Sequence, residues 1–212
     1  MKKIIGLLLY AIGFIVYNLK RTSSYYMNRR ITRQLGGGKR IIQYPYRIAG
    51  VNNIQSGDNI NIGKDSVLMC TMSKIVLKGH FVSGPGLKII AGDHMAVVGK
   101  FIDDVSEDIK SALDTSRECD QDVVIEEDVW AGTNVTILKG VTVGRGCIIA
   151  AGAVVTKSMP SYCIVAGIPA RPIKMRWTVD QIIDHEKMLY DEKERLSRET
   201  ILEIEKKNKQ IK

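Results

Sequence analysis

The stretch that decides the fold covers residues 125–160 and reads in sixes: IEEDVW, AGTNVT, ILKGVT, VGRGCI, IAAGAV and VTKSMP. Neither a helix of period 3.6 nor a strand of period two produces apolar residues at a six-residue spacing. This spacing is typical of a parallel β-helix, in which three short flat sides form one triangular coil. We therefore expect the first and fifth residues of each hexad to point inward and to stack from coil to coil. The first residues are Ile125, Ala131, Ile137, Val143, Ile149 and Val155, and the fifth are Val129, Val135, Val141, Cys147, Ala153 and Met159.

The same pattern begins upstream and is interrupted once. Residues 77–94 read LKGHFV, SGPGLK and IIAGDH, and the phase is then lost until Val123. Gly and Asn recur within the hexads, where they suit turns with positive φ. We predict a β-helical domain over residues 46–175 with an inserted loop at 95–122. An insertion of this length is more often functional than an ordinary turn.

Residues 1–45 form a separate N-terminal arm in this prediction. Residues 4–19 are uncharged and mostly apolar, and the first 47 residues hold ten Lys or Arg and no Asp or Glu. About 16 apolar residues reach only ~24 Å as a helix, which is short for a hydrocarbon core of ~30 Å. No small-x-small cleavage site follows the run, as a signal peptide would require. A helix at the membrane interface, a short spanning helix and a helix packed within an oligomer stay open.

The overall composition narrows the function classes. The formal net charge is +8, with three Phe and two Trp in 212 residues. No motif pairs aromatic with basic residues, so we do not expect nucleic acid as a partner. The four cysteines contain no C-x-x-C pair, which predicts reduced structural thiols and neither a metal site nor a disulfide framework.

Residues 176–212 are predicted to form a charged C-terminal α-helix. Thr178 and Gln181 fit a capping box at its start. Apolar residues at helical spacing would pack on the last coil, and the Lys and Glu residues would face solvent.

Three segments within the repeats resemble a known family, the hexapeptide-repeat acyltransferases, in the branch of galactoside, maltose and xenobiotic O-acetyltransferases. They are residues 128–132 (DVWAG), 152–157 (GAVVTK) and 166–171 (AGIPAR), and the resemblance covers roughly residues 60–174. It implies a mainly β fold, a left-handed parallel β-helix, although parallel crossovers are usually right-handed. It also implies a homotrimer with active sites between subunits, and acyl transfer from acetyl-CoA without a metal.

The resemblance also implies a CoA site. The positions that match the family's CoA-binding and phosphate-binding residues, together with small residues that leave room for the pantetheine arm, are Gly132, Thr133, Ala151, Gly152, Thr156, Lys157, Arg171 and Lys174. Basic side chains suit phosphate through charge-assisted hydrogen bonds. Lys174 stands where some relatives carry Arg, which would give up a bidentate contact.

His94 is the candidate catalytic residue. Acyl transfer to a hydroxyl needs a base for the acceptor's proton, and histidine titrates near neutral pH. His94 stands at the end of a coil where the insertion begins, the place where the family keeps its catalytic histidine. We expect His80 to be a surface residue at a coil corner and His185 to be solvated on the C-terminal helix.

The insertion carries Asp103, Asp104, Glu107 and Asp108, whose carboxylates could bind sugar hydroxyls. We expect a carbohydrate or nucleotide-sugar acceptor, O-acetylated during bacterial surface polysaccharide synthesis. N-acetylation of an amino-sugar nucleotide and a non-catalytic β-helical scaffold are the alternatives. We expect the protein in the cytoplasm, with possible contact of the N-terminal arm with the inner face of the membrane.

Overall fold

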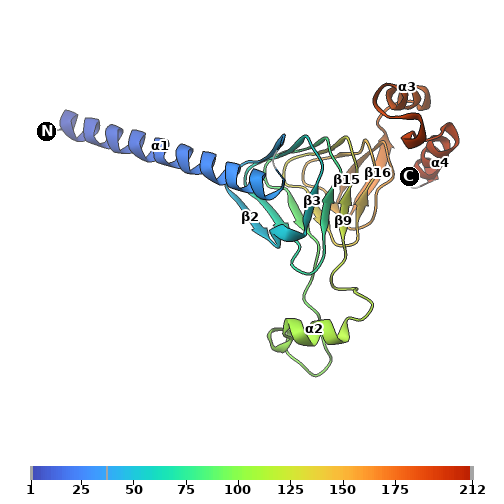
Figure 1. The fold of residues 1–212 in the computed structure, drawn as a ribbon, viewed down its shortest axis with the longest axis horizontal. Coiled ribbons are helices and arrows are strands. Elements are labelled where there is room, and N and C mark those ends of the chain that lie inside the picture. Colours follow the sequence, from blue (N-terminus) through green and yellow to red (C-terminus); the bar gives the residue numbers. More distant parts are fainter. Residues whose placement is uncertain (1, 37, 211–212) are drawn as a thin grey trace.

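The computed structural model describes residues 2–36 and 38–210, and its centre is a triangular parallel β-helix (Figure 1). Three sheets, A, B and C, form the three sides, and the chain visits them in that order in every coil. Sheet A holds β1 (Arg40–Ile42), β4 (Ile60–Ile62), β7 (Phe81–Ser83), β10 (Val129–Ala131), β13 (Ile148–Ile149), β15 (Cys163–Gly167) and β16 (Ala170–Met175). Sheet B holds β2 (Tyr46–Ala49), β5 (Ser66–Met69), β8 (Lys88–Ile90), β11 (Thr136–Leu138) and β14 (Val154–Val155). Sheet C holds β3 (Ile54–Ser56), β6 (Ile75–Leu77), β9 (Val123–Ile125) and β12 (Thr142–Val143).

The strand register confirms the six-residue repeat. Trp130 lies beside Ile148 and Thr136 beside Val154, so one coil takes three hexads. All twelve predicted inward positions of residues 125–160 are at most 5% exposed. The fourth residue of five successive hexads has positive φ, as a tight corner requires; these are Asp128, Asn134, Gly140, Gly146 and Gly152.

The N-terminal arm is one helix, α1 (Lys2–Gln34), which projects from the β1 end of the coils (Figure 1). Its last turns cover the first coil, because Ile31 and Leu35 are buried in the core. The hydroxyl of Thr32 donates to the Arg40 carbonyl at 2.6 Å. The first strand begins at Arg40, earlier than the predicted domain boundary at 46, since residues 40–45 carry no hexad pattern to reveal it. Among the described residues, no helix is both long and apolar enough to cross a membrane.

The C-terminal segment differs from the single predicted helix. It forms α3 (Val179–Leu189) and α4 (Arg198–Gln210), with the short 3-10 turn η3 (Glu192–Glu194) between them. The predicted capping box is confirmed, since the Thr178 hydroxyl accepts from Gln181 N–H and the Gln181 side chain accepts from Thr178 N–H. Ile182 and Ile201 are buried with Tyr162 against the last coil. The chain turns back so that both helices can cover the open end of the core.

The insertion leaves the coils as a long excursion between β8 and β9 (Figure 1). It contains the 3-10 turn η2 (Ile102–Asp104) and the helix α2 (Glu107–Leu113). Its base is closed by backbone bonds from Asp93 N–H to the Cys119 carbonyl at 2.8 Å and from Gln121 N–H to the Ala91 carbonyl at 3.2 Å. The coil therefore resumes in phase after the insertion.

Candidate active site

We name the two relevant edges of the β-helix by the sheets they join. The chain crosses from sheet B to sheet C at the B/C corner, which includes His94, Lys139 and Lys157. It crosses from sheet A to sheet B at the A/B corner, which includes Thr133 and Ala151. These two corners lie at opposite ends of the strands of sheet B.

His94 stands at the B/C corner, four residues after the end of β8, where the insertion departs. It lines a cavity of about 370 Å³ together with residues of two coils and of the insertion. Its side chain is exposed, and no other described residue forms a hydrogen bond with it. The cavity is lined by Met69, Thr71, Ile90, Gly92, Asp93, His94, Glu107, Lys110 and Asp120. The histidine is thus open to a ligand that enters this cavity.

A row of lysines continues the B/C corner. The Lys139 ammonium lies 2.7 Å from the Asp93 carboxylate, so the residue next to His94 pairs with Lys139. Lys157 is one coil further along, because Ile137 is in register with Val155. The sequence did not indicate Lys139. Aligning the hexads across the insertion could have done so, because β11 is in register with β8 through Ile137 and Ile89.

A buried ion pair supports the wall of the cavity. Lys110, on α2, lies 2.6 Å from Asp120, and both side chains are about nine-tenths buried. Burial lowers the pKa of Lys110, but the hydrogen bond and charge of Asp120 outweigh this and hold the pKa above its ordinary value. Glu107 is 3.8 Å from the same ammonium. Of the four acidic residues that the sequence indicated, only Glu107 lines this cavity. The pair was not predicted, because nothing in the sequence places α2 beside residue 120.

The A/B corner provides a narrow lane of small residues. A side chain at Gly132 would bring a Cβ within 2.6 Å of the Ala151 backbone nitrogen, so this coil contact requires glycine. Gly152 N–H donates to the Thr133 carbonyl at 2.8 Å, which stacks the two turns. Thr133, Ala151 and Gly152 are exposed. Arg171 lies beside Ala166 at the end of the adjoining hairpin, near this corner, and is exposed.

The remaining predicted CoA residues lie elsewhere. Thr156 and Lys157 are exposed at the B/C corner, beyond β14. Lys174 pairs with Ile164, toward the opposite end of the hairpin from Arg171. The two corners are separated by the length of the strands of sheet B with their flanking residues. This is about five or six extended residues, or roughly 15–20 Å. A single subunit therefore does not bring His94 together with Thr133, Ala151 and Arg171.

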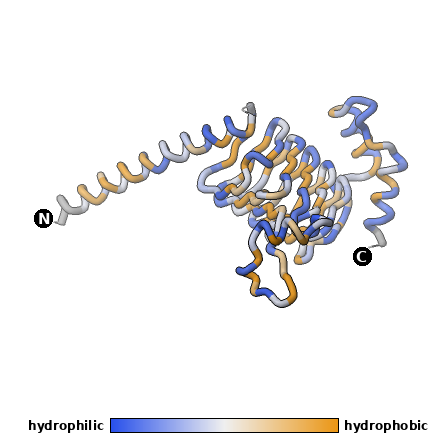
Figure 2. The backbone as a smooth tube through the Cα atoms, turned by 60° about the horizontal axis from the view of Figure 1, so that its bottom comes forward, coloured by the Kyte–Doolittle hydropathy of each residue, from blue (hydrophilic) through white to orange (hydrophobic). Residues whose placement is uncertain are grey.

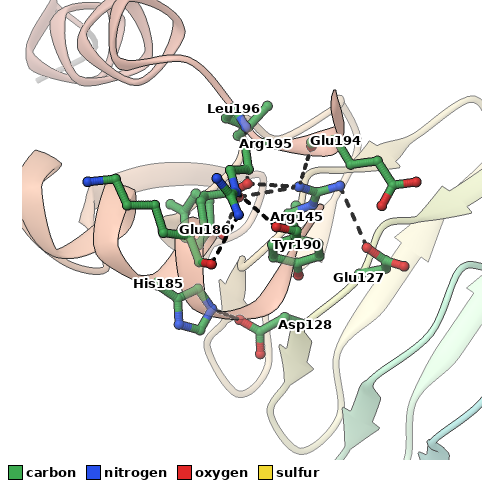
Figure 3. Close-up of polar contacts among 11 residues, drawn as sticks. Glu127, Asp128, Arg145, His185, Glu186, Tyr190, Glu194, Arg195 and Leu196 are labelled. Carbon is green, nitrogen blue, oxygen red and sulfur yellow. Dashed lines mark hydrogen bonds and ion pairs between the residues drawn. The ribbon is translucent and has the colours of Figure 1, made fainter. Parts of the chain in front are cut away.

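A second polar cluster fastens the C-terminal helices to the coils (Figure 3). The Glu186 carboxylate is buried and accepts from the Arg145 guanidinium at 3.0 Å and from the Tyr162 hydroxyl at 2.5 Å. Burial lowers the pKa of Arg145, but Glu186, Tyr190 and Glu127 together outweigh burial and hold that pKa above its ordinary value. His185, predicted to be solvated, lies edge-on against Tyr162, with Nε2 3.5 Å from the Asp128 carboxylate. Its position follows from the helix turning back onto the last coil, which hexad periodicity does not show.

Of the other histidine predictions, that for His80 is confirmed. It is exposed at a coil corner with positive φ, and its Nε2 lies 3.3 Å from the Asn59 amide nitrogen. It directly precedes β7, at a different corner from His94, and it lines none of the cavity around His94. It thus offers a matched control for His94.

Comparison with known proteins agrees with this architecture. Residues 122–157 match the family described as Bacterial transferase hexapeptide (six repeats). A hexapeptide-repeat containing acetyltransferase of Vibrio cholerae, solved with acetyl coenzyme A, is 27% identical with a TM-score of 0.56, covering 74% of this chain and 79% of that one. A maltose O-acetyltransferase of Clostridium difficile 630 shares the fold at 24% identity and a TM-score of 0.54, covering 71% of this chain and 75% of that one.

A curated relative matches over the repeats alone. It is a 2,3,4,5-tetrahydropyridine-2,6-dicarboxylate N-acetyltransferase of Staphylococcus aureus (strain JH9), 56% identical over 52 residues. The match takes 24% of this chain and spans 22% of the relative's length.

These findings confirm the predicted fold. The chain folds as a left-handed parallel β-helix, carries hexapeptide repeats over residues 122–157, and resembles hexapeptide-repeat acetyltransferases. The Vibrio cholerae neighbour was solved with the CoA thioester that the sequence led us to expect.

Proposed function

We propose that this protein is an acetyl-CoA-dependent O-acetyltransferase that modifies a hydroxyl of a carbohydrate, with His94 as general base. The observation that carries the proposal is the position of His94. It is an exposed histidine in a cavity at the interruption of the repeat, where it can accept a proton from a bound acceptor. Positioned general bases contribute about 10²–10⁴-fold to the rate of such reactions.

The proposed step balances with the thioester as acyl donor. His94 takes the proton of the acceptor hydroxyl while its oxygen attacks the acetyl carbonyl. The tetrahedral intermediate collapses, the C–S bond breaks, and CoA leaves as a thiolate. The imidazolium then returns the proton to sulfur, which regenerates the neutral histidine.

The cavity offers acceptors and donors for a polyhydroxyl ligand. The Glu107 and Asp93 carboxylates accept hydrogen bonds from hydroxyls, and the exposed Thr71 hydroxyl both donates and accepts. The Lys110–Asp120 pair is already satisfied internally and holds α2 against the coil. We assign it a positioning role for the acceptor side of the cavity.

We further propose that CoA lies between two subunits of a homotrimer. The A/B corner of one subunit would hold the CoA chain through Thr133, Ala151 and Arg171, and the B/C corner of its neighbour would supply His94. An apolar row along the outer face of sheet A supports self-association. Val82, Trp130, Ile148 and Ile164 follow one another in register, and Val82 and Trp130 are about half exposed. Because acetyl-CoA is a cytoplasmic metabolite, the proposed reaction takes place in the cytoplasm. The acceptor that we favour is a precursor of a surface polysaccharide.

The experiment measures acetyl-CoA turnover with a panel of sugars and amino-sugar nucleotides. The release of the free CoA thiol reports the rate. We expect activity with a hydroxyl acceptor, its loss in His94→Asn, and its retention in His80→Asn. Turnover that is equal in both variants would refute the role of His94. Failure of the wild-type protein to bind CoA in calorimetry would favour the scaffold alternative.

N-acetylation is the second candidate, because the match over the repeats is to an N-acetyltransferase. Hydroxylamine treatment of the product separates the two reactions, since it cleaves acetyl esters and leaves amides intact. A hydroxylamine-stable product would replace the O-acetyl assignment.

A further inference from the structure

Residues 6–19 of α1 are mostly apolar, and the rest of the described chain leaves them uncovered (Figure 2). Leu7, Leu8, Leu9 and Tyr10 point in four directions around the helix, about 100° apart, and each is exposed by 60% or more. A single partner helix would cover one stripe and leave the others in water. A helix that is apolar on all sides belongs in a core or in lipid.

The polarity of α1 is divided along its axis. Residues 6–19 carry no charge, whereas residues 20–33 hold Lys20, Arg21, Arg29, Arg30 and Arg33. The first acidic residue of the whole chain is Asp58. A helix that changes from apolar to cationic from one end to the other suits an anionic membrane surface, with the apolar end inserted.

The arginines also face away from the β-helix. Ile31 and Leu35 are buried against the first coil, whereas Arg29 and Arg33 are exposed and lie roughly on the opposite side of the helix by its 3.6-residue period. Tyr26, Arg29, Arg30, Arg33 and Gln34 surround a cavity of about 390 Å³. This cavity presents guanidinium groups to an anion, and guanidinium binds phosphate bidentately.

We propose that α1 docks the protein on a bilayer of anionic phospholipid. The apolar residues 6–19 enter the acyl region, and the cavity formed by the arginines of residues 29–33 binds headgroup phosphates. The arginines begin ~15 Å beyond Leu19, and the headgroup layer is only about 5–8 Å thick, so the helix must lie obliquely. Because the arginines oppose the coil, this tilt brings them to the lipid and keeps the β-helix in water.

Co-sedimentation of the full chain with vesicles tests the proposal. The vesicles contain phosphatidylcholine alone or with roughly one-third phosphatidylglycerol, at low and high salt. We expect binding to the anionic vesicles that weakens with salt. The triple change Arg29→Gln, Arg30→Gln and Arg33→Gln should weaken it about 100-fold, from about fivefold for each cation near the surface.

The matched control is the triple change Lys193→Gln, Lys206→Gln and Lys207→Gln, which removes the same charge from the other end of the molecule. This variant should bind like the wild type. Phe14→Glu should weaken binding to the anionic vesicles at both salt concentrations. Thermal unfolding should be unchanged in all variants, because these side chains lie outside the core.

Wild-type protein that stays in the supernatant would overturn the proposal, as would equal losses of vesicle binding in the two triple variants. A drop in sedimenting mass of Phe14→Glu, without any vesicle binding of the wild type, would instead assign the apolar segment to contacts between copies.

Discussion

The two corners that flank sheet B are built from the same repeat, yet they differ in chemistry. The A/B corner is lined by Gly, Ala and Thr, and a Cβ at Gly132 would collide with the next coil. The B/C corner carries Asp93, His94, Lys139 and Lys157, and it alone is opened by an insertion. Close coil stacking at one corner leaves a smooth lane, whereas the other corner presents proton-transfer and charged groups. The comparison suggests that donor binding and proton transfer are divided between them.

Replacing His94 should have the largest effect on catalysis. We expect His94→Asn to lower kcat by about 10²–10⁴, because the acceptor proton loses its base. The KM for acetyl-CoA should change little, since we propose that the donor binds at the other corner. Initial-rate kinetics with both substrates varied measures this, and a change confined to the KM for acetyl-CoA would reverse the assignment of the corners.

Breaking the buried pair in the insertion should reduce stability. Lys110→Met leaves the Asp120 carboxylate buried without its partner, which costs about 3 kcal/mol for such pairs. Lys110→Arg keeps the charge and serves as the control. Urea unfolding would report the loss, and hydrogen exchange would localise it to α2 and the strands next to the insertion. An unfolding free energy equal to that of the wild type would show that the pair is not structural.

Blocking the small-residue lane should affect donor binding. Ala151→Phe places a ring on the exposed A/B corner, in the space where we propose that the CoA chain lies. We expect the KM for acetyl-CoA to rise by roughly 10- to 100-fold with a much smaller change in kcat. Calorimetric titration with CoA provides the independent check, and unchanged affinity would remove this corner from the donor site.

The reactivity of the cysteines tests the contrast between the tightly packed coils and the insertion, and it is the smallest effect that we expect. Burial raises the pKa of Cys70 to about 11, of Cys147 to about 12 and of Cys163 to about 11. These three thiols lie in the coil core, whereas Cys119 is half-buried at the base of the insertion. We expect a disulfide reagent at mildly alkaline pH to modify Cys119 first in the native protein and the other three only after unfolding. Early labelling of Cys147 would mean that the last coils open locally.

Periodicity predicted the core well because every coil applies the same rule. The first and fifth residues of each hexad in residues 125–160 are buried, including Ala131 and Met159, which fit the pattern least well. The insertion broke the phase, so the Lys139–Asp93 and Lys110–Asp120 pairs could not be seen from local spacing. The folding back of α3 and α4, and with it the burial of His185, depends on contacts at one coil end that no repeat specifies.

The sequence also indicated the site residues without showing that they occupy different corners. Resemblance brought His94, Thr133 and Arg171 into one expected site, and the topology places them on opposite sides of sheet B. The donor and the base therefore meet only if a second subunit completes the site.

Complementation between two variants tests this central claim most directly, at an acetyl-CoA concentration far below the KM of Ala151→Phe, where both variants have little activity. His94→Asn and Ala151→Phe subunits are unfolded together in equal amounts, refolded and assayed for acetyl transfer. If neighbouring subunits share each site, one interface in four combines an intact His94 corner with an intact lane, so roughly a quarter of wild-type activity should return. A mixture no more active than the two variants refolded separately would contradict the account and place the whole site within one subunit.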